Sequence, residues 1–303
     1  MKISAVTSVF VGLVMATCVA ALPTSGDKID PRSLPSTLSD AVRADLAKRH
    51  PSSYTLHTSS SNQLAKRDIS TNPAIITSCH AKKHLAITFD DGPYENHKNL
   101  VDQFDAIGSK ATFFVNGNNW RCVYDKDQVS ALRYSYKRGH QICSHTWSHP
   151  NLTTLNDEQL DRQVQLVEDA LWKIIGAVPA CIRAPYGEIR DDQVERLQNK
   201  WGLKVIGWSN DTRDADGAQV EESVKVYKGL FAPTCAIILN HETVGTTVTN
   251  VIPRALKIIK KHHYKGSSTV ARISKFQPYK VVGDHQHRDD SWTCDGKPAA
   301  GQA

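Results

Sequence analysis

The sequence has little that would suit a membrane protein, a nucleic-acid-binding protein or a cysteine-ligated zinc protein. Beyond an apolar run at the N-terminus, no stretch of the 303 residues is long and apolar enough to span a bilayer. Residues 296–303 are small and polar, so no lipid-anchor signal or membrane anchor is expected. The absence of any CxxC pair argues against a cysteine zinc cluster. The net charge of +6 is modest and the basic residues are dispersed, so nucleic acid is not an expected partner.

The N-terminus has the pattern of a secretory signal. Met1 and Lys2 precede an apolar run over residues 5–14 and small residues at 18–21. This order is typical of a cleaved signal peptide, which we place at residues 1–21. The protein is therefore expected to be secreted.

The next segment, residues 22–67, is rich in Ser, Thr and Pro, a composition that packs poorly. It contains the tripeptide Ala-Lys-Arg twice, at 47–49 and 65–67. Each dibasic pair is a candidate processing site. We therefore expect a propeptide or a disordered segment here, followed by one catalytic domain over residues 68–303.

Six of the seven cysteines remain once a signal peptide containing Cys18 is removed. An even number in a secreted chain is compatible with disulfides, although six cysteines allow fifteen pairings. Cys79 precedes the first predicted strand and Cys235 precedes the strand that leads into the last motif. We hypothesise that these two are bridged and tie the two ends of the fold together.

From residue 84 onward, short apolar segments alternate with amphipathic ones, and glycines close several of the latter. The predicted strands are residues 84–89, 111–115, 140–143, 180–182, 203–208 and 236–239. The predicted helices are residues 96–107, 127–138, 156–176, 191–201, 219–230 and 252–262. Such alternation predicts an α/β fold of parallel βα units with a core of about 84–276. The carboxyl ends of the strands then meet at one rim, so distant residues can share a pocket.

Five segments place reactive side chains at or just after the ends of these strands. They are residues 88–93, 145–149, 183–187, 211–214 and 239–241. They contribute a carboxylate pair, two histidines four residues apart, an arginine and a third histidine. That set suffices for a metal-assisted hydrolysis with a separate base and acid.

The first two segments predict a metal site. Asp90 and Asp91 precede a Gly-Pro turn, and neighbours on an extended backbone point apart unless the turn rotates one of them. One carboxylate can then bind metal while the other accepts a proton. His145 and His149 have the spacing that brings two imidazoles together, and with one aspartate they form a two-histidine, one-carboxylate triad.

The other segments predict the groups that support proton transfer. Arg183 is suited to holding a carboxylate in its ionised form. His241 is the natural general acid, because its ordinary pKa lies near neutrality. Asp211 or Asp214 would stabilise its protonated form, and we favour Asp211 because it lies nearer the strand end.

In this order the segments resemble the motifs of the polysaccharide deacetylases of carbohydrate esterase family four, above all the secreted fungal chitin deacetylases. The resemblance covers roughly residues 84–276. It implies a distorted (β/α) barrel with fewer strands than the eight-stranded form, in a single catalytic domain. It also implies metal-dependent removal of N-acetyl groups from N-acetylglucosamine units of chitin or chitooligosaccharides.

The resemblance also implies a role for each residue. The general base would be Asp90, oriented by Arg183, and the general acid would be His241. The metal ligands would be Asp91, His145 and His149. The backbone N–H of Tyr186 would stabilise the oxyanion, and Leu239 would line the pocket for the acetyl methyl group. Zinc suits these ligands best, and cobalt or manganese would also fit.

One segment departs from the family pattern. Ala215 follows Asp214 where an aromatic residue is usual, which leaves one wall of the substrate groove undefined. Trp120, Trp147 and Trp208 are our candidates for stacking against sugar rings, with core packing as the alternative. Of two glycosylation sequons, at Asn151 and Asn210, the first is the better candidate.

Two further functions stay open. An O-acetyl esterase acting on xylan would use the same site, and a catalytically silent sugar-binding protein would keep the fold alone. No separate carbohydrate-binding module is visible in the sequence, and we expect a monomer.

Overall fold

A computed structural model describes residues 34–49, 54–56, 74–79 and 81–303. The expected signal peptide and the second Ala-Lys-Arg tripeptide lie outside these residues. Among the residues described, no helix is long and apolar enough to cross a bilayer.

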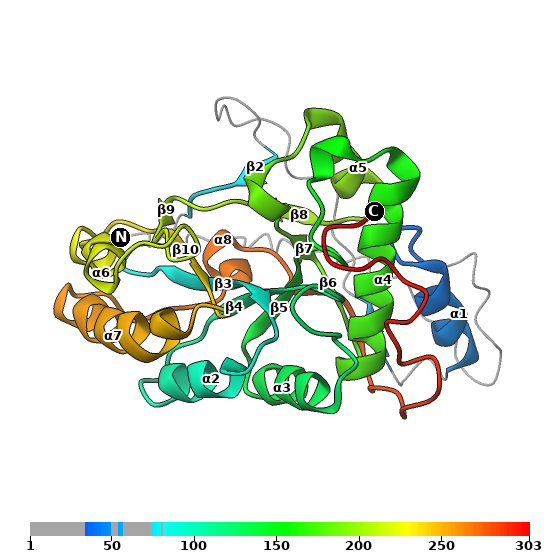
Figure 1. The fold of residues 1–303 in the computed structure, drawn as a ribbon, viewed down its shortest axis with the longest axis horizontal. Helices are drawn as coiled ribbons and strands as arrows, with labels where there is room; N and C mark the ends of the chain where they lie inside the picture. Colours follow the sequence, from blue (N-terminus) through cyan, green and yellow to red (C-terminus); the bar gives the residue numbers. More distant parts are fainter. Residues whose placement is uncertain (1–33, 50–53, 57–73, 80) are drawn as a thin grey trace, which may run out of the picture.

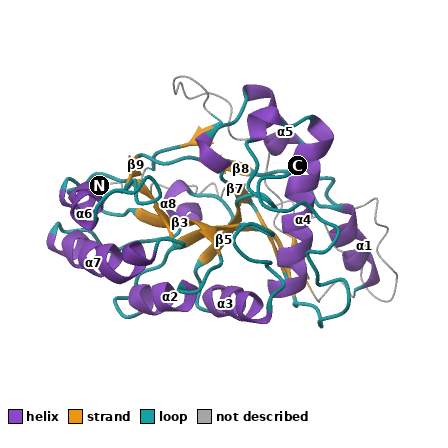
Figure 2. Cartoon of the chain, viewed as in Figure 1, coloured by secondary structure: helices purple, strands orange, loops and turns teal. Residues whose placement is uncertain are grey.

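The centre of the molecule is a curled sheet of eight strands with helices packed around it (Figures 1 and 2). The strand order is β2-β8-β7-β5-β4-β3-β10-β9, and every neighbouring pair is parallel. The strands are β2 (Ile75–Ile76), β3 (Ala86–Gly92), β4 (Thr112–Val115), β5 (Gln141–Ser144), β7 (Cys181–Ile182), β8 (Lys204–Ile206), β9 (Asn210–Asp211) and β10 (Ile237–His241). In the described part of the chain the edge strands β2 and β9 do not pair with each other, so the distorted (β/α) barrel is open.

The helices confirm the predicted alternation. They are α1 (Asp40–Lys48), α2 (His97–Asp105), α3 (Lys126–Lys137), α4 (Asp157–Ile175), α5 (Asp191–Asn199), α6 (Val220–Lys228), α7 (Ile252–Lys261) and α8 (Val270–Ser274). The longest, α4, begins and ends where its sequence predicts. Asn156 and Gln159 form a capping box at its start, and Gly176 closes it at a left-handed φ of 69°.

The strand count differs from the prediction of fewer than eight. The additional edge strands, β2 and β9, contain two residues each. Two residues are too few to produce a hydrophobic period, so neither strand is visible in the sequence. The core also continues past residue 276, since Tyr279 and Val281 are buried.

The inner strands are held by apolar packing against the helices. Phe89 of β3 stacks on Phe113 of β4 with ring centroids 5.5 Å apart, and Phe104 of α2 meets Phe89 edge-on at 5.9 Å. All three are fully buried. Burying each aromatic side chain contributes about 1.5–3 kcal/mol, which makes this layer a rigid base for the strand ends.

A second, antiparallel sheet contains β1 (Tyr54–Leu56), β11 (Tyr279–Gly283) and β6 (Ala177–Pro179). Strand β1 and helix α1 belong to an N-terminal arm, which we define as residues 34–49 and 54–56. Helix α1 lies beside α4 (Figure 1). The buried side chains of the arm pack with Trp172, Val178 and Val281.

The arm lies within residues 22–67, where we predict a propeptide or a disordered segment. Leu38, Val42 and Leu46 recur every four residues and are buried along one side of the arm. A judgement from average composition overlooks this short stripe, which forms a helix because Trp172 and its neighbours cover it. The described residues of the arm are thus packed on the rest of the molecule, and the propeptide or disordered segment over residues 22–67 stays a prediction.

Three disulfides pair the six cysteines that follow Cys18. The predicted bridge between Cys79 and Cys235 is present, and it links the segment before β3 to the segment before β10. The other two bridges join Cys122 to Cys294 and Cys143 to Cys181. The last of these connects β5 to the neighbouring strand β7.

Candidate active site

The five predicted segments meet at the carboxyl ends of the parallel strands, around a cavity of about 420 Å³. Nine of the predicted site residues line it: Asp90, Asp91, His145, His149, Tyr186, Trp208, Asp211, Leu239 and His241. Arg183 lies fully buried beneath Asp90, and Trp147 lies outside the cavity lining.

A break in the regular pairing of β3 brings two neighbouring carboxylates into this cavity. The register between β3 and β4 shifts between Phe89 and Gly92, and Asp91 has a φ of 70°. An irregularity of this kind re-aims a side chain that would otherwise alternate to the far face. Asp90 and Asp91 therefore face the same space but have different neighbours.

Arg183 holds Asp90 in place. Its Nη1 donates to Asp90 Oδ1 at 2.7 Å and to Thr88 Oγ1 at 2.8 Å, and its Nη2 donates to the Gly207 carbonyl at 2.9 Å. Burial raises the pKa of Asp90 above its ordinary value, and the guanidinium opposes that rise. The result is an oriented carboxylate whose Oδ2 is turned toward His145 Nε2, 3.7 Å away.

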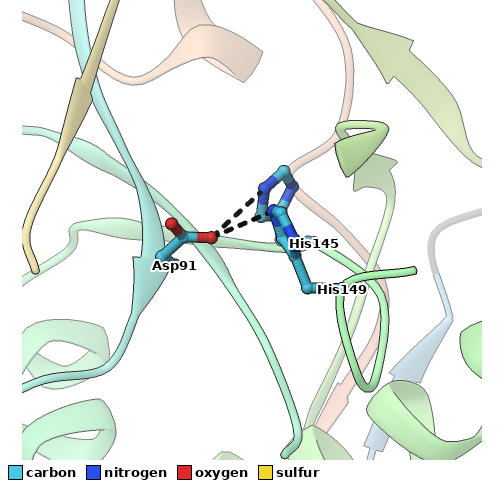
Figure 3. Close-up of side chains that lie close together, drawn as sticks. All are labelled: Asp91, His145 and His149. Atoms are coloured by element: carbon cyan, nitrogen blue, oxygen red, sulfur yellow. Dashed lines mark ion pairs between the residues drawn. The ribbon is translucent and has the colours of Figure 1, made fainter. Parts of the chain in front are cut away.

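Asp91, His145 and His149 form the candidate metal centre (Figure 3). One ligand atom from each lies within 4.8 Å of the others. Asp91 Oδ1 is 3.2 Å from His149 Nε2 and 3.7 Å from His145 Nε2. The close-up shows the carboxylate of Asp91 facing the two imidazoles across a gap.

The protonation of these residues fits a cation. His145 Nδ1 lies 2.9 Å from the Arg183 carbonyl, which can only accept, so Nδ1 carries the proton and Nε2 offers a lone pair. Burial and the nearby His149 keep the pKa of His145 well below its ordinary value, so the ring is neutral. Asp91 Oδ1 is buried without a hydrogen-bond partner among the described residues. A divalent cation would satisfy these facing acceptors.

His241 has Asp214 as its partner, which corrects our preference for Asp211. His241 Nδ1 donates to Asp214 Oδ1 at 2.7 Å, and the His241 N–H donates to Asp214 Oδ2 at 2.8 Å. Asp211 lies in β9 beside Leu239, and the chain then reverses at Arg213, whose φ is 57°. That reversal brings Asp214 under His241, so distance from the strand end along the sequence was the wrong criterion.

The pairing of His241 with Asp214 favours the protonated form of His241. Burial alone would lower the pKa of His241, but the hydrogen bond and negative charge of Asp214 outweigh it and raise the pKa to about 9. Burial works against the charge of Asp214 too, yet the bonds from His241 and Thr247 hold its pKa below the ordinary value. His241 is therefore protonated at neutral pH. In the parallel register of β10 and β3 it stands directly opposite Asp90.

The predicted tryptophans have different positions. Trp208 lines the cavity, whereas Trp147 is 0% exposed and donates from Nε1 to the Pro298 carbonyl at 3.0 Å. Trp147 is thus a core residue, and its assignment to substrate binding was wrong because its position in the segment did not reveal which way its ring points.

The third candidate, Trp120, lies on the surface. It is 57% exposed, and its ring centroid is 5.7 Å from that of Tyr94. Trp120 is not among the residues that line the cavity, so stacking of its ring on a sugar stays a prediction.

Strained backbone is concentrated around the cavity. Among the described residues, eight other than glycine have φ between 57° and 70°. Five of these lie in the segments that carry the site: Asp91, Thr146, His149, Tyr186 and Arg213. Each such conformation costs on the order of 1–3 kcal/mol and persists only where its surroundings enforce it. Here the strained turns direct side chains into one cavity.

Comparison with known proteins agrees with this geometry. The family model for polysaccharide deacetylases matches residues 77–206. A chitin deacetylase from Pestalotiopsis sp is 35% identical over 61% of this chain and 62% of its own length. The match therefore spans just under two thirds of that relative. A peptidoglycan-N-acetylglucosamine deacetylase from Bacillus cereus is 32% identical over 66% of this chain and 70% of its own.

A solved structure agrees as well. The chitin deacetylase of Colletotrichum lindemuthianum superposes with a TM-score of 0.65 and 28% identity, covering 70% of this chain and 97% of that one. The chain belongs to the polysaccharide deacetylase family, which confirms the resemblance inferred from its motifs.

Proposed function

We propose that this protein is a secreted, metal-dependent deacetylase that hydrolyses the N-acetyl groups of N-acetylglucosamine units in chitin or chitooligosaccharides. One observation carries the proposal. An oriented carboxylate, a histidine hydrogen-bonded to an aspartate and an aspartate–histidine–histidine cluster line one cavity. The fungal relatives named above are chitin deacetylases, which supports the choice of substrate.

The cluster of Asp91, His145 and His149 would hold the metal, with zinc as our first choice and cobalt or manganese as alternatives. A divalent ion bound there supplies Lewis-acid polarisation of the acetamide carbonyl and lowers the pKa of the attacking water. The three protein ligands leave room for groups other than the protein, as a catalytic centre requires.

The remaining chemistry is proton transfer by the chain's own residues. Asp90 accepts a proton from the attacking water through Oδ2, while Arg183 keeps Oδ1 occupied. A bond forms between the water oxygen and the carbonyl carbon. His241 then gives its Nε2 proton to the nitrogen as the carbon–nitrogen bond breaks, which yields acetate and a free amine.

Substrate contacts are assigned to residues on the rim. Leu239 is an apolar member of the cavity lining and suits the acetyl methyl group. The Tyr186 ring is 65% exposed beside His149, and Trp208 lines the same cavity, so both are placed to contact a sugar. Our assignment of the Tyr186 N–H to the oxyanion stays part of the proposal.

Secretion is supported by the three disulfides, because such bridges persist in oxidising compartments. The signal peptide, the glycosylation of Asn151 and the monomeric state remain predictions.

The test is acetate release from N-acetylglucosamine oligomers, with and without a chelator. We expect chelator-sensitive release that Asp90→Asn reduces by about 10²–10⁴-fold, the range of general base catalysis. Asp290→Asn, on the exposed surface, is the matched control.

Acetylated xylan and acetylated peptidoglycan are assayed in parallel. Release from xylan alone would replace the proposal by the O-acetyl esterase, and preference for peptidoglycan would change the polymer. If the protein, loaded with zinc or cobalt, releases no acetate from any of the three substrates, a sugar-binding protein would be favoured.

A further inference from the structure

The segment from His145 to His149, which we call the metal-ligand loop, is hydrogen-bonded to residues 298–302. Residues 146–148 connect His145 to His149 and are fully buried. Behind them lie residues 298–302, which we call the C-terminal strap. Figure 1 shows the C-terminal chain, in red, running beside α4.

The strap binds the loop through the polar groups of two successive residues. Trp147 donates from Nε1 to the Pro298 carbonyl at 3.0 Å. Ser148 accepts at its carbonyl from the Gly301 N–H at 2.6 Å, and its hydroxyl donates to the Gln302 carbonyl. These bonds secure both residues that immediately precede the ligand His149.

Three contacts hold the strap itself. The disulfide between Cys122 and Cys294 fixes the chain just before it. Gln163 of α4 lies between strap and loop, since its Nε2 donates to Ser148 Oγ at 2.8 Å and to the Gln302 carbonyl at 3.1 Å. Asn118 adds a second bond to the Pro298 carbonyl at 3.0 Å.

The conformation of residues 146–149 depends on the groups that surround them. Thr146 and His149 both have left-handed φ values, 69° and 58°. A residue other than glycine keeps that conformation only where its surroundings enforce it. The Trp147 carbonyl is also fixed, by the N–H groups of Gly117 and Asn118 at 2.8 and 2.6 Å. The strap supplies further contacts, to the Trp147 ring and to Ser148.

From this arrangement we infer that the C-terminal strap positions His145 and His149 for metal binding. The inference rests on the proposed function, because it assumes that these imidazoles are ligands. The strap residues touch no reacting atom. They act through Trp147 and Ser148, as partners outside the ligand set do at other metal sites.

Two variants of the full-length protein test this, with zinc affinity measured by competition against a chromophoric chelator. Trp147→Phe removes the bond to Pro298, and Ser148→Ala removes the bond to Gln302. We expect each to weaken zinc binding by about 10–100-fold, the usual cost of losing such a partner. A chain ending at Lys297 removes the whole strap but keeps the Cys122–Cys294 bridge, and is expected at the upper end of that range.

Trp292→Phe is the matched control. Trp292 is also buried, and within the described part of the chain its Nε1 has no hydrogen-bond partner. It should lower the melting temperature as a Trp-to-Phe change in a core does, yet leave zinc affinity within about twofold of wild type. Circular dichroism below the transition confirms that each variant is folded.

Zinc affinity near wild type in folded Trp147→Phe and Ser148→Ala would overturn the inference. So would an equal loss in Trp292→Phe, which would indicate a general stability effect. Failure of the proposed function has a different signature. Wild type would then bind zinc and respond to the strap variants but release no acetate. A wild type that binds no zinc would overturn both.

Discussion

The rim of the cavity and the N-terminal arm are built by opposite means. The rim contains buried charges, with Asp90 and Arg183 paired at 2.7 Å, and five residues in strained conformations. The arm contains an ordinary capped helix whose apolar side chains pack on Trp172, and none of its residues has a left-handed φ. The buried charges and strained residues of the rim lower stability but create the reactive geometry, whereas the packing of the arm contributes stability and no chemistry.

The largest expected difference between variants of the rim and variants of the arm is in kcat. His241→Asn removes the proposed general acid, and kcat should fall by about 10²–10⁴-fold, while zinc affinity should be retained because His241 is not in the proposed ligand set. Steady-state acetate release and chelator competition measure the two quantities. His263→Asn is the control, since His263 is exposed at the end of α7. Activity within threefold of wild type in His241→Asn would remove His241 from the mechanism.

In the arm the expected loss is in stability alone. Leu46 is fully buried, and Leu46→Ala should lower the free energy of unfolding by about 2–5 kcal/mol through lost burial and a cavity. Denaturant titration measures this change, with Ala44→Ser on the exposed side of α1 as control. Below the transition, kcat and zinc affinity should equal those of wild type. A loss of zinc affinity in the folded variant would show that the arm and the rim are coupled.

The smallest expected change is a shift in pH dependence. His241 must be protonated to act as the acid, so kcat/KM should fall as pH rises through about 9, the pKa that Asp214 maintains. Because the negative charge opposes the lowering effect of burial, Asp214→Asn should move this alkaline limb to lower pH. Asp211→Asn should leave the limb in place. If Asp211→Asn moved it and Asp214→Asn did not, our assignment of the partner would be reversed.

The pattern of residues along the chain was sufficient for the framework of the fold. Alternating apolar and amphipathic segments predicted the inner strands and the helices from α2 to α7, because period and terminal glycines are local properties. The strand-end positions of Asp90, His145, Arg183 and His241 predicted a shared cavity, because parallel strands end at one rim.

Other features depended on how the backbone turns in three dimensions. The choice of Asp214 over Asp211 follows from the reversal at Arg213, and the burial of Trp147 follows from the direction of its ring within a strained loop. Neither is a property of residue type or spacing. The arm packs on Trp172, and the segment between His145 and His149 is hydrogen-bonded to carbonyls of residues 298 and 302. Local sequence determines periods and strand ends, but only the folded chain decides which distant groups meet.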